Sequence, residues 1–207
     1  VWTVDGSVAL PAQDWTVTLN GAIDYTKAFG EEDVTGAAAA HLTKTFGSDL
    51  RAGAFAGVSD LGGENYFSVG GEVQKYLASA TLTGVVAYTD LDGADAWTFG
   101  GDYAYYVNPS LRLNAGVSYN NIDTDVAGKV DAWAYGVGAE YQLDNSPISL
   151  FGSWQRVSLN DVDVDSDNFV IGARYNFGGA LQTLDRAGAN LGPVSYTHLR
   201  AHETKAN

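Results

Sequence analysis

Residues 131–143 read DAWAYGVGAEYQL. In an extended chain, Trp133, Tyr135 and Val137 share one face of this stretch, while alanines, glycines and Glu140 share the opposite face. A side-chain period of two is typical of a β-strand. A strand of a membrane barrel turns its apolar face toward lipid and its small or polar face toward a watery lumen. We therefore predict that this stretch crosses a membrane as one strand of a barrel.

The same alternation recurs along the chain and predicts eleven antiparallel strands, with no competing helical period. The strands are Trp2–Leu10, Trp15–Tyr25, Val34–Phe46, Leu50–Val58, Tyr66–Tyr76, Ser79–Thr89, Ala96–Val107, Leu111–Asn120, Asp131–Leu143, Ile148–Val157 and Asn168–Phe177. Tight turns alternate with longer acidic connections at Lys27–Asp33, Ser59–Asn65, Asp90–Asp95, Asn121–Val130 and Ser158–Asp167. This rhythm is typical of outer-membrane barrels. The predicted fold class is all-β, an antiparallel up-and-down transmembrane β-barrel over residues 1–177.

Aromatic residues on the predicted outer face gather at both ends of the strands. Trp15, Phe46 and Tyr141 lie beside tight turns, whereas Trp97 and Trp133 lie beside the longer connections. Aliphatic and small residues fill the band between them. Amphipathic rings favour the two interfaces of a membrane, so this distribution supports a spanning barrel over a soluble core.

The ends of the chain carry three expectations. Bacterial barrels with both termini in the periplasm have an even strand count, so eleven strands predict an N-terminal truncation and an intact barrel of twelve. Residues 178–193 lack alternation and are expected to form a periplasmic C-terminal extension. Val194–Thr204 resembles the translation of a transposase-type sequencing adapter, so residues 194–207 are expected to be a non-native tail.

Composition excludes several classes of protein and site. The 207 residues contain no Cys and carry a net charge of −14, which argues against disulfides, thiolate metal sites and nucleic-acid binding. Before the adapter-like tail His41 is the only histidine, and its inward phase near the tight-turn end argues against Ser–His catalysis. Asp161–Asp167 lacks the Gly and Glu of a calcium-binding loop. We predict no enzyme, no metal site and no cofactor.

The last predicted strand carries a resemblance to a known family. Ile171–Phe177, IGARYNF, is similar to the aromatic-x-aromatic closing strand that the barrel assembly machinery recognises, although Gly178 follows where such chains end. With its alternation and turn rhythm, the chain resembles Gram-negative outer-membrane porin-like β-barrels of the alphaproteobacterial kind. The resemblance implies a place in the bacterial outer membrane, contact with its lipid, engagement by the assembly machinery, and self-association into a homo-oligomer.

The predicted inner face carries charged side chains among many small residues. The candidate pore-lining residues are Asp24, Arg51, Glu72, Asp102, Arg112, Glu140 and Arg174. With the acidic connections, they predict a channel for passive diffusion of small hydrophilic solutes or ions that mildly favours cations. Two alternatives stay open. The inner side chains could pair and fill the lumen of a non-conducting structural or adhesive barrel, or the aromatic face could be the core of a soluble β-sandwich binding protein.

Overall fold

The fold is one antiparallel sheet. The computed structural model describes residues 2–28, 31–61, 64–91, 93–124, 128–159 and 164–189. The strands are β1 (Trp2–Ala12), β2 (Trp15–Ala28), β3 (Glu31–Phe46), β4 (Leu50–Leu61), β5 (Glu64–Tyr76), β6 (Ala80–Leu91), β7 (Ala94–Asn108), β8 (Leu111–Thr124), β9 (Gly128–Gln142), β10 (Ile148–Leu159) and β11 (Val164–Tyr175). They pair in chain order, β1 to β11, each antiparallel to the next. The predicted all-β, up-and-down class is confirmed.

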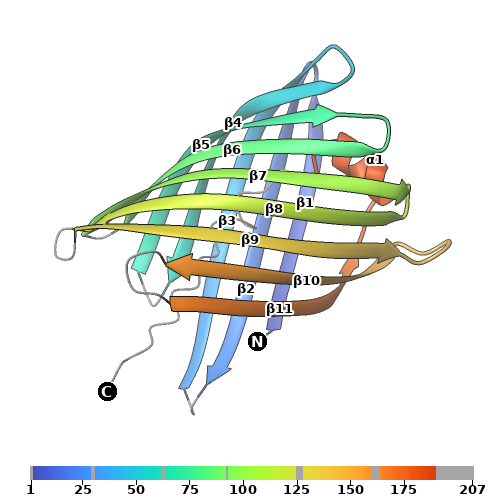
Figure 1. The fold of residues 1–207 in the computed structure, drawn as a ribbon. Helices are drawn as coiled ribbons and strands as arrows, with labels where there is room; N and C mark the ends of the chain where they lie inside the picture. The colour runs from blue at the N-terminus through green and yellow to red at the C-terminus, as the bar shows by residue number, and fades with distance from the viewer. Residues whose placement is uncertain are drawn as a thin grey trace.

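The sheet curls around an interior. Figure 1 shows β1, β2 and β3 passing behind β7 to β10, so the early and late strands form opposite walls. Within the described part of the chain, β1 pairs only with β2, and β11 only with β10. These two strands are the edges of the curled sheet.

Side-chain alternation divides the sheet into an outer and an inner face. In β9, Trp133, Tyr135 and Val137 are exposed, with 53% of the Val137 surface accessible. Ala132 and Glu140 on the other face are buried. A soluble sheet would bury its large apolar residues, whereas a transmembrane barrel presents them to lipid. The predicted directions of the two faces are confirmed.

The predicted boundaries are wrong at the end of the strands where long loops were expected. β2 and β3 continue through the expected loop until Ala28 pairs with Glu31. β4 and β5 likewise continue until Leu61 pairs with Glu64. Antiparallel hydrogen bonds satisfy backbone groups whatever the side chains, so acidic residues did not stop the strands. The acidic sequence therefore forms the strand ends themselves.

The chain ends differently from the strands. After β11, residues 178–189, here called the C-terminal segment, contain the helix α1 (Leu181–Arg186). Figure 1 shows α1 at the end of the sheet where β7 and β9 finish, which is the tight-turn end. Six residues are too few for a helical period to stand out in sequence, which is why no helix was predicted. In the described ranges, no helix is long and apolar enough to cross a membrane.

Candidate pore lining

Six of the seven predicted pore-lining residues have described side chains, and all six belong to the inner face. They are Arg51 on β4, Glu72 on β5, Asp102 on β7, Arg112 on β8, Glu140 on β9 and Arg174 on β11. Asp24 lies on β2 opposite Thr3, and its side chain falls outside the described residues. Strand alternation and sheet curl together aim these side chains at one interior.

Arg174 connects three strands. Its Nη1 donates to Glu140 Oε2 at 2.9 Å, and its Nη2 donates to Asp5 Oδ2 on β1 at 3.1 Å. Ser149 donates from Oγ to the second oxygen of Glu140 at 2.5 Å. Both carboxylates therefore share one guanidinium, which lowers the cost of burying Glu140.

Arg51 lies at the tight-turn end and is 4% exposed. Its Nε donates to the Tyr76 hydroxyl at 2.8 Å, and its Nη1 donates to Thr43 Oγ1 at 3.0 Å. Its Nη2 donates to the backbone carbonyl of Arg186, also at 3.0 Å. A buried guanidinium held by neutral oxygens keeps its positive charge directed at the interior.

Glu72 pairs with the buried His41. His41 Nδ1 lies 2.8 Å from Glu72 Oε1, and His41 Nε2 lies 3.0 Å from Asn20 Oδ1. Both ring nitrogens therefore face oxygens of β5 and β2, and the ring packs 5.4 Å from that of Phe55. This arrangement holds the imidazole as part of the wall. Both nitrogens are engaged, so neither is left to act as the general base that activates a nucleophile.

Asp102 and Arg112 form a looser pair. Arg112 Nη2 lies 3.6 Å from Asp102 Oδ1, and Asn114 donates from Nδ2 to Asp102 Oδ2 at 3.4 Å. Among the described residues, Arg112 Nε has no hydrogen-bond partner. This nitrogen is buried, so the pair leaves one polar atom unsatisfied in the wall.

Two inward phenylalanines lie flat against the wall. The Phe151 ring lies over its cross-strand partner Gly172, where an added Cβ would be 2.6 Å from ring atom Cζ. The Phe55 ring covers Gly70 in the same way, with an added Cβ 2.4 Å from its Cζ. Only glycine permits this close approach. Because the rings lie against the glycine backbone, they do not project into the lumen.

Sequence reasoning missed the polar groups of the C-terminal segment. Asp185 is 1% exposed, and its Oδ2 accepts a hydrogen bond from Thr81 Oγ1 at 2.5 Å. The spacing of Leu181, Leu184 and Asp185 at i, i+3 and i+4 was the available signal for a helical face. Whether this helical face contacts the barrel depends on where the segment lies, and the local sequence does not encode that position.

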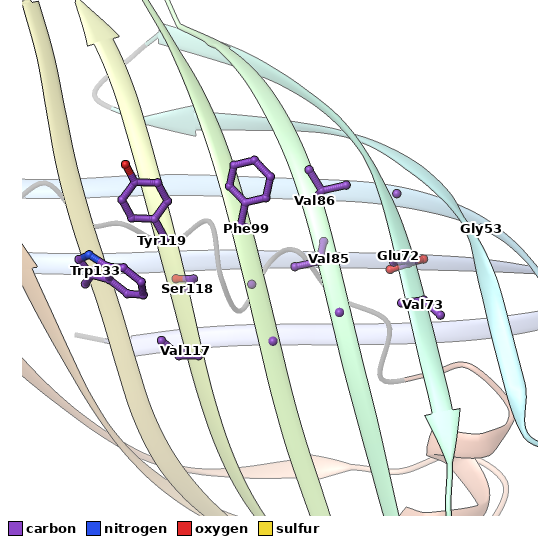
Figure 2. Close-up of a pocket in the computed structure, with 14 residues that line it drawn as sticks. Gly53, Glu72, Val73, Val85, Val86, Phe99, Val117, Ser118, Tyr119 and Trp133 are labelled. Carbon is purple, nitrogen blue, oxygen red and sulfur yellow. The ribbon is translucent and has the colours of Figure 1, made fainter.

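The outer face carries cross-strand aromatic pairs. The rings of Tyr88 and Trp97 are 5.3 Å apart, and those of Tyr119 and Trp133 are 5.1 Å apart. Residues of β4 to β9, Tyr119 and Trp133 among them, line a hollow with a volume of about 730 Å³. Figure 2 shows these side chains. Most of its lining side chains, Phe99 included, belong to the outward set, and glycines separate them. Lipid would meet this hollow, so we do not place the solute path there.

A curled sheet with apolar side chains outside and a hydrogen-bonded polar lining inside defines a transmembrane β-barrel. The family model for Gram-negative porins matches residues 3–185, and the chain belongs to that family. It is therefore a porin-like protein of the bacterial outer membrane, as its resemblance implied.

Solved structures show the same fold. A NanC porin superposes with a TM-score of 0.63 at 8% identity, covering 84% of this chain and 93% of that one. A loop L8 deletion mutant of OmpT, an outer membrane protein of Vibrio cholerae, superposes with a TM-score of 0.54 at 17% identity, covering 83% of this chain. The chain spans about 62% of the length of that OmpT mutant. At these identities the likeness concerns the fold alone. None of the curated proteins compared with the chain matches it.

Proposed function

We propose that this barrel is a channel for passive diffusion of small hydrophilic solutes through its lumen. The observation that carries the proposal is the opposition of the two faces, seen most clearly in β9. Val137 faces outward and is exposed, whereas Glu140 faces inward and holds polar partners from two strands. Charged groups such as Arg51 and Glu72 are costly inside a membrane protein. Their presence on the inner face is explained when water and solutes enter the interior.

A mild preference for cations is the second part of the proposal. The chain carries a net charge of −14, and acidic residues gather where the strands extend past the aromatic pairs. Described examples are Asp60, Asp90, Asp95, Asp123 and Asp165. A negative field at a channel mouth raises the local concentration of cations.

One alternative is a non-conducting structural or adhesive barrel. The pairing of Arg174 with Glu140 and Asp5 favours it, because satisfied ion pairs can fill a lumen. Against it, the side chains of Arg174 and Asp5 stay 31% and 36% exposed, so this pair does not seal the interior. The soluble β-sandwich finds no support in the described strands, since all eleven lie in one sheet and no second sheet covers the aromatic face.

Partners follow from the same proposal. We expect outer-membrane lipid around the aromatic pairs, recognition by the barrel assembly machinery, and self-association within the membrane. We expect no catalytic role, because both ring nitrogens of His41 face Glu72 and Asn20. Chemical crosslinking in lipid vesicles, followed by gel electrophoresis, tests self-association, and a ladder limited to the monomer would contradict it.

Single-channel recording in planar bilayers tests the proposed function. Folded protein, verified by heat-modifiable gel migration, should produce discrete conductance steps. Under a potassium chloride gradient, the reversal potential should have the sign of a cation-preferring pore. Heat-denatured protein is the control for leakage caused by the preparation. Silence from folded protein would reject the channel in favour of the structural barrel, and an anion-signed potential would reject the cation preference alone.

A further inference from the structure

The C-terminal segment contacts progressively earlier strands as it proceeds. It begins beside β9 and ends beside β1. Its first contacts fall at the tight-turn end, and its last, Ser7, lies in the middle of β1. The hydrogen-bond partners, in segment order, are Gln142 for Gly179, Pro109 and Ala78 for Gln182, Thr81 for Asp185, Arg51, Leu77 and Ala78 for Arg186, Thr18 for Gly188 and Ser7 for Ala189. The segment therefore links one wall of the barrel to the other.

The length of the segment shows which path it takes. From β9 to β1 there are eight strand-to-strand steps, which is about 38 Å along the wall at ~4.8 Å per step. From Gly179 to Ala189 the chain includes the six residues of α1, so it spans at most about 25 Å. A path along the wall is too long for it. The segment therefore runs inside the wall, closer to the barrel axis than the strands, and narrows the opening there.

Its anchors are buried inward-facing groups. Leu181 is 4% exposed and packs in one cluster with Ala104 and Tyr106 of β7. Asp185 is buried against Thr81 on β6. Gly188 lies against Arg51, where an added Cβ would be 2.9 Å from Nη1. Apolar packing and charge-assisted hydrogen bonds together hold the segment inside the mouth.

We propose that the C-terminal segment is an internal constriction that sets the size limit of the channel at its tight-turn mouth. A solute leaving at this end passes between the segment and the wall. The exposed side chains of the segment are Thr183, Arg186 and Ala187, and the Arg186 guanidinium is held at the mouth by the carbonyls of Leu77 and Ala78. This inference rests on the proposed function, because a size limit has meaning only for a conducting lumen.

Two truncations test the constriction in planar bilayers. One chain ends at Phe177 and lacks the segment, and its matched control ends at Ala189 and keeps it. Without the segment in the mouth, conductance should rise by about twofold or more, and larger polyethylene glycols should enter the pore. Equal conductance and equal polymer exclusion in two conducting chains would overturn the constriction and leave the channel standing. Silence of both folded chains would overturn the channel function.

Thiol labelling tests the placement of the segment without relying on conductance or on folding of the shorter chain. The protein contains no Cys, so Leu181→Cys and Ala187→Cys each introduce a single thiol. Leu181 is buried and Ala187 is exposed in the same segment. In folded protein, a maleimide should label position 181 about tenfold more slowly than position 187. Equal labelling rates would show that the segment is not seated in the mouth and would overturn the inference.

Discussion

Arg174 of β11 donates a hydrogen bond of 3.1 Å to the carboxylate of Asp5 of β1, although 169 positions separate them in the chain. The two strands are the edges of the described sheet. The same guanidinium also holds Glu140, so one side chain joins both edges to the inner wall. Among the described residues no backbone pairing joins β1 to β11, so side chains connect the two edges at this point.

Arg174→Ala should destabilise the barrel. It leaves Glu140, whose side chain is 7% exposed, without its cation, and frees Asp5 from the opposite edge. The free energy of unfolding should fall by about 1–3 kcal/mol, because a buried carboxylate loses a charged donor. Urea unfolding in lipid vesicles measures this. Arg156→Ala is the control, since Arg156 pairs with Asp167 at an exposed site. An equal or larger loss in that control would contradict the role of the edge pair.

Removing positive charge from the lining should increase cation selectivity. Arg51→Ala and Arg112→Ala each delete a guanidinium that faces the interior. The cation-to-anion permeability ratio should rise by about twofold, which corresponds to roughly 0.4 kcal/mol. Reversal potentials under a salt gradient report the ratio. Arg156→Ala, which removes the same charge from the outer face, should leave it unchanged, and unchanged potentials in both inner variants would remove these residues from the solute path.

Gly172→Ala should push the Phe151 ring off the wall. The three nearest atoms to an added Cβ all belong to that ring, between 2.6 and 3.3 Å away. We expect a loss of about 1–3 kcal/mol in unfolding free energy and a lower conductance as the ring moves inward. Adding Phe151→Ala should restore conductance, because it removes the displaced ring. Gly152→Ala is the matched control, since its added Cβ has no neighbour closer than 3.7 Å. No coupling between positions 151 and 172 would contradict the proposed packing.

A lysine introduced on the outer face should destabilise the barrel, whereas a lysine introduced on the inner face should be tolerated. Val85 and Val86 are neighbours in β6, and Val85 lies opposite Glu72 on the inner face. Val86→Lys places an ammonium toward lipid near the middle of the strand, which should cost about 2–4 kcal/mol of folding free energy in a bilayer. Val85→Lys places it beside a carboxylate in the polar interior and should be tolerated. Folding yield in lipid vesicles, read from heat-modifiable migration, measures both. The reverse order would mean that the two faces are exchanged.

The sequence predicted each strand and the face of most side chains. In β9, the exposed Val137 and the buried Glu140 follow directly from alternation between neighbouring residues. Strand ends were harder to predict. Ala28 and Glu31 lie in a stretch whose polar residues suggested a loop, yet their backbone groups remain paired. The residue at which backbone pairing stops is not marked by side-chain type. Amino-acid composition therefore predicts strand ends poorly.

What the sequence by itself determined was the strand pattern and the polarity of the two faces, because a period of two is local and depends only on adjacent residues. Only the tertiary structure decided which polar groups meet across the chain. His41 is hydrogen-bonded to Glu72, 31 positions away, and Ser7 donates to the carbonyl of Ala189, 182 positions away. Such partners depend on the curl of the sheet and on the path of the C-terminal segment across its mouth. Both arise from how all the strands close around the interior, and no single stretch of the chain encodes that geometry.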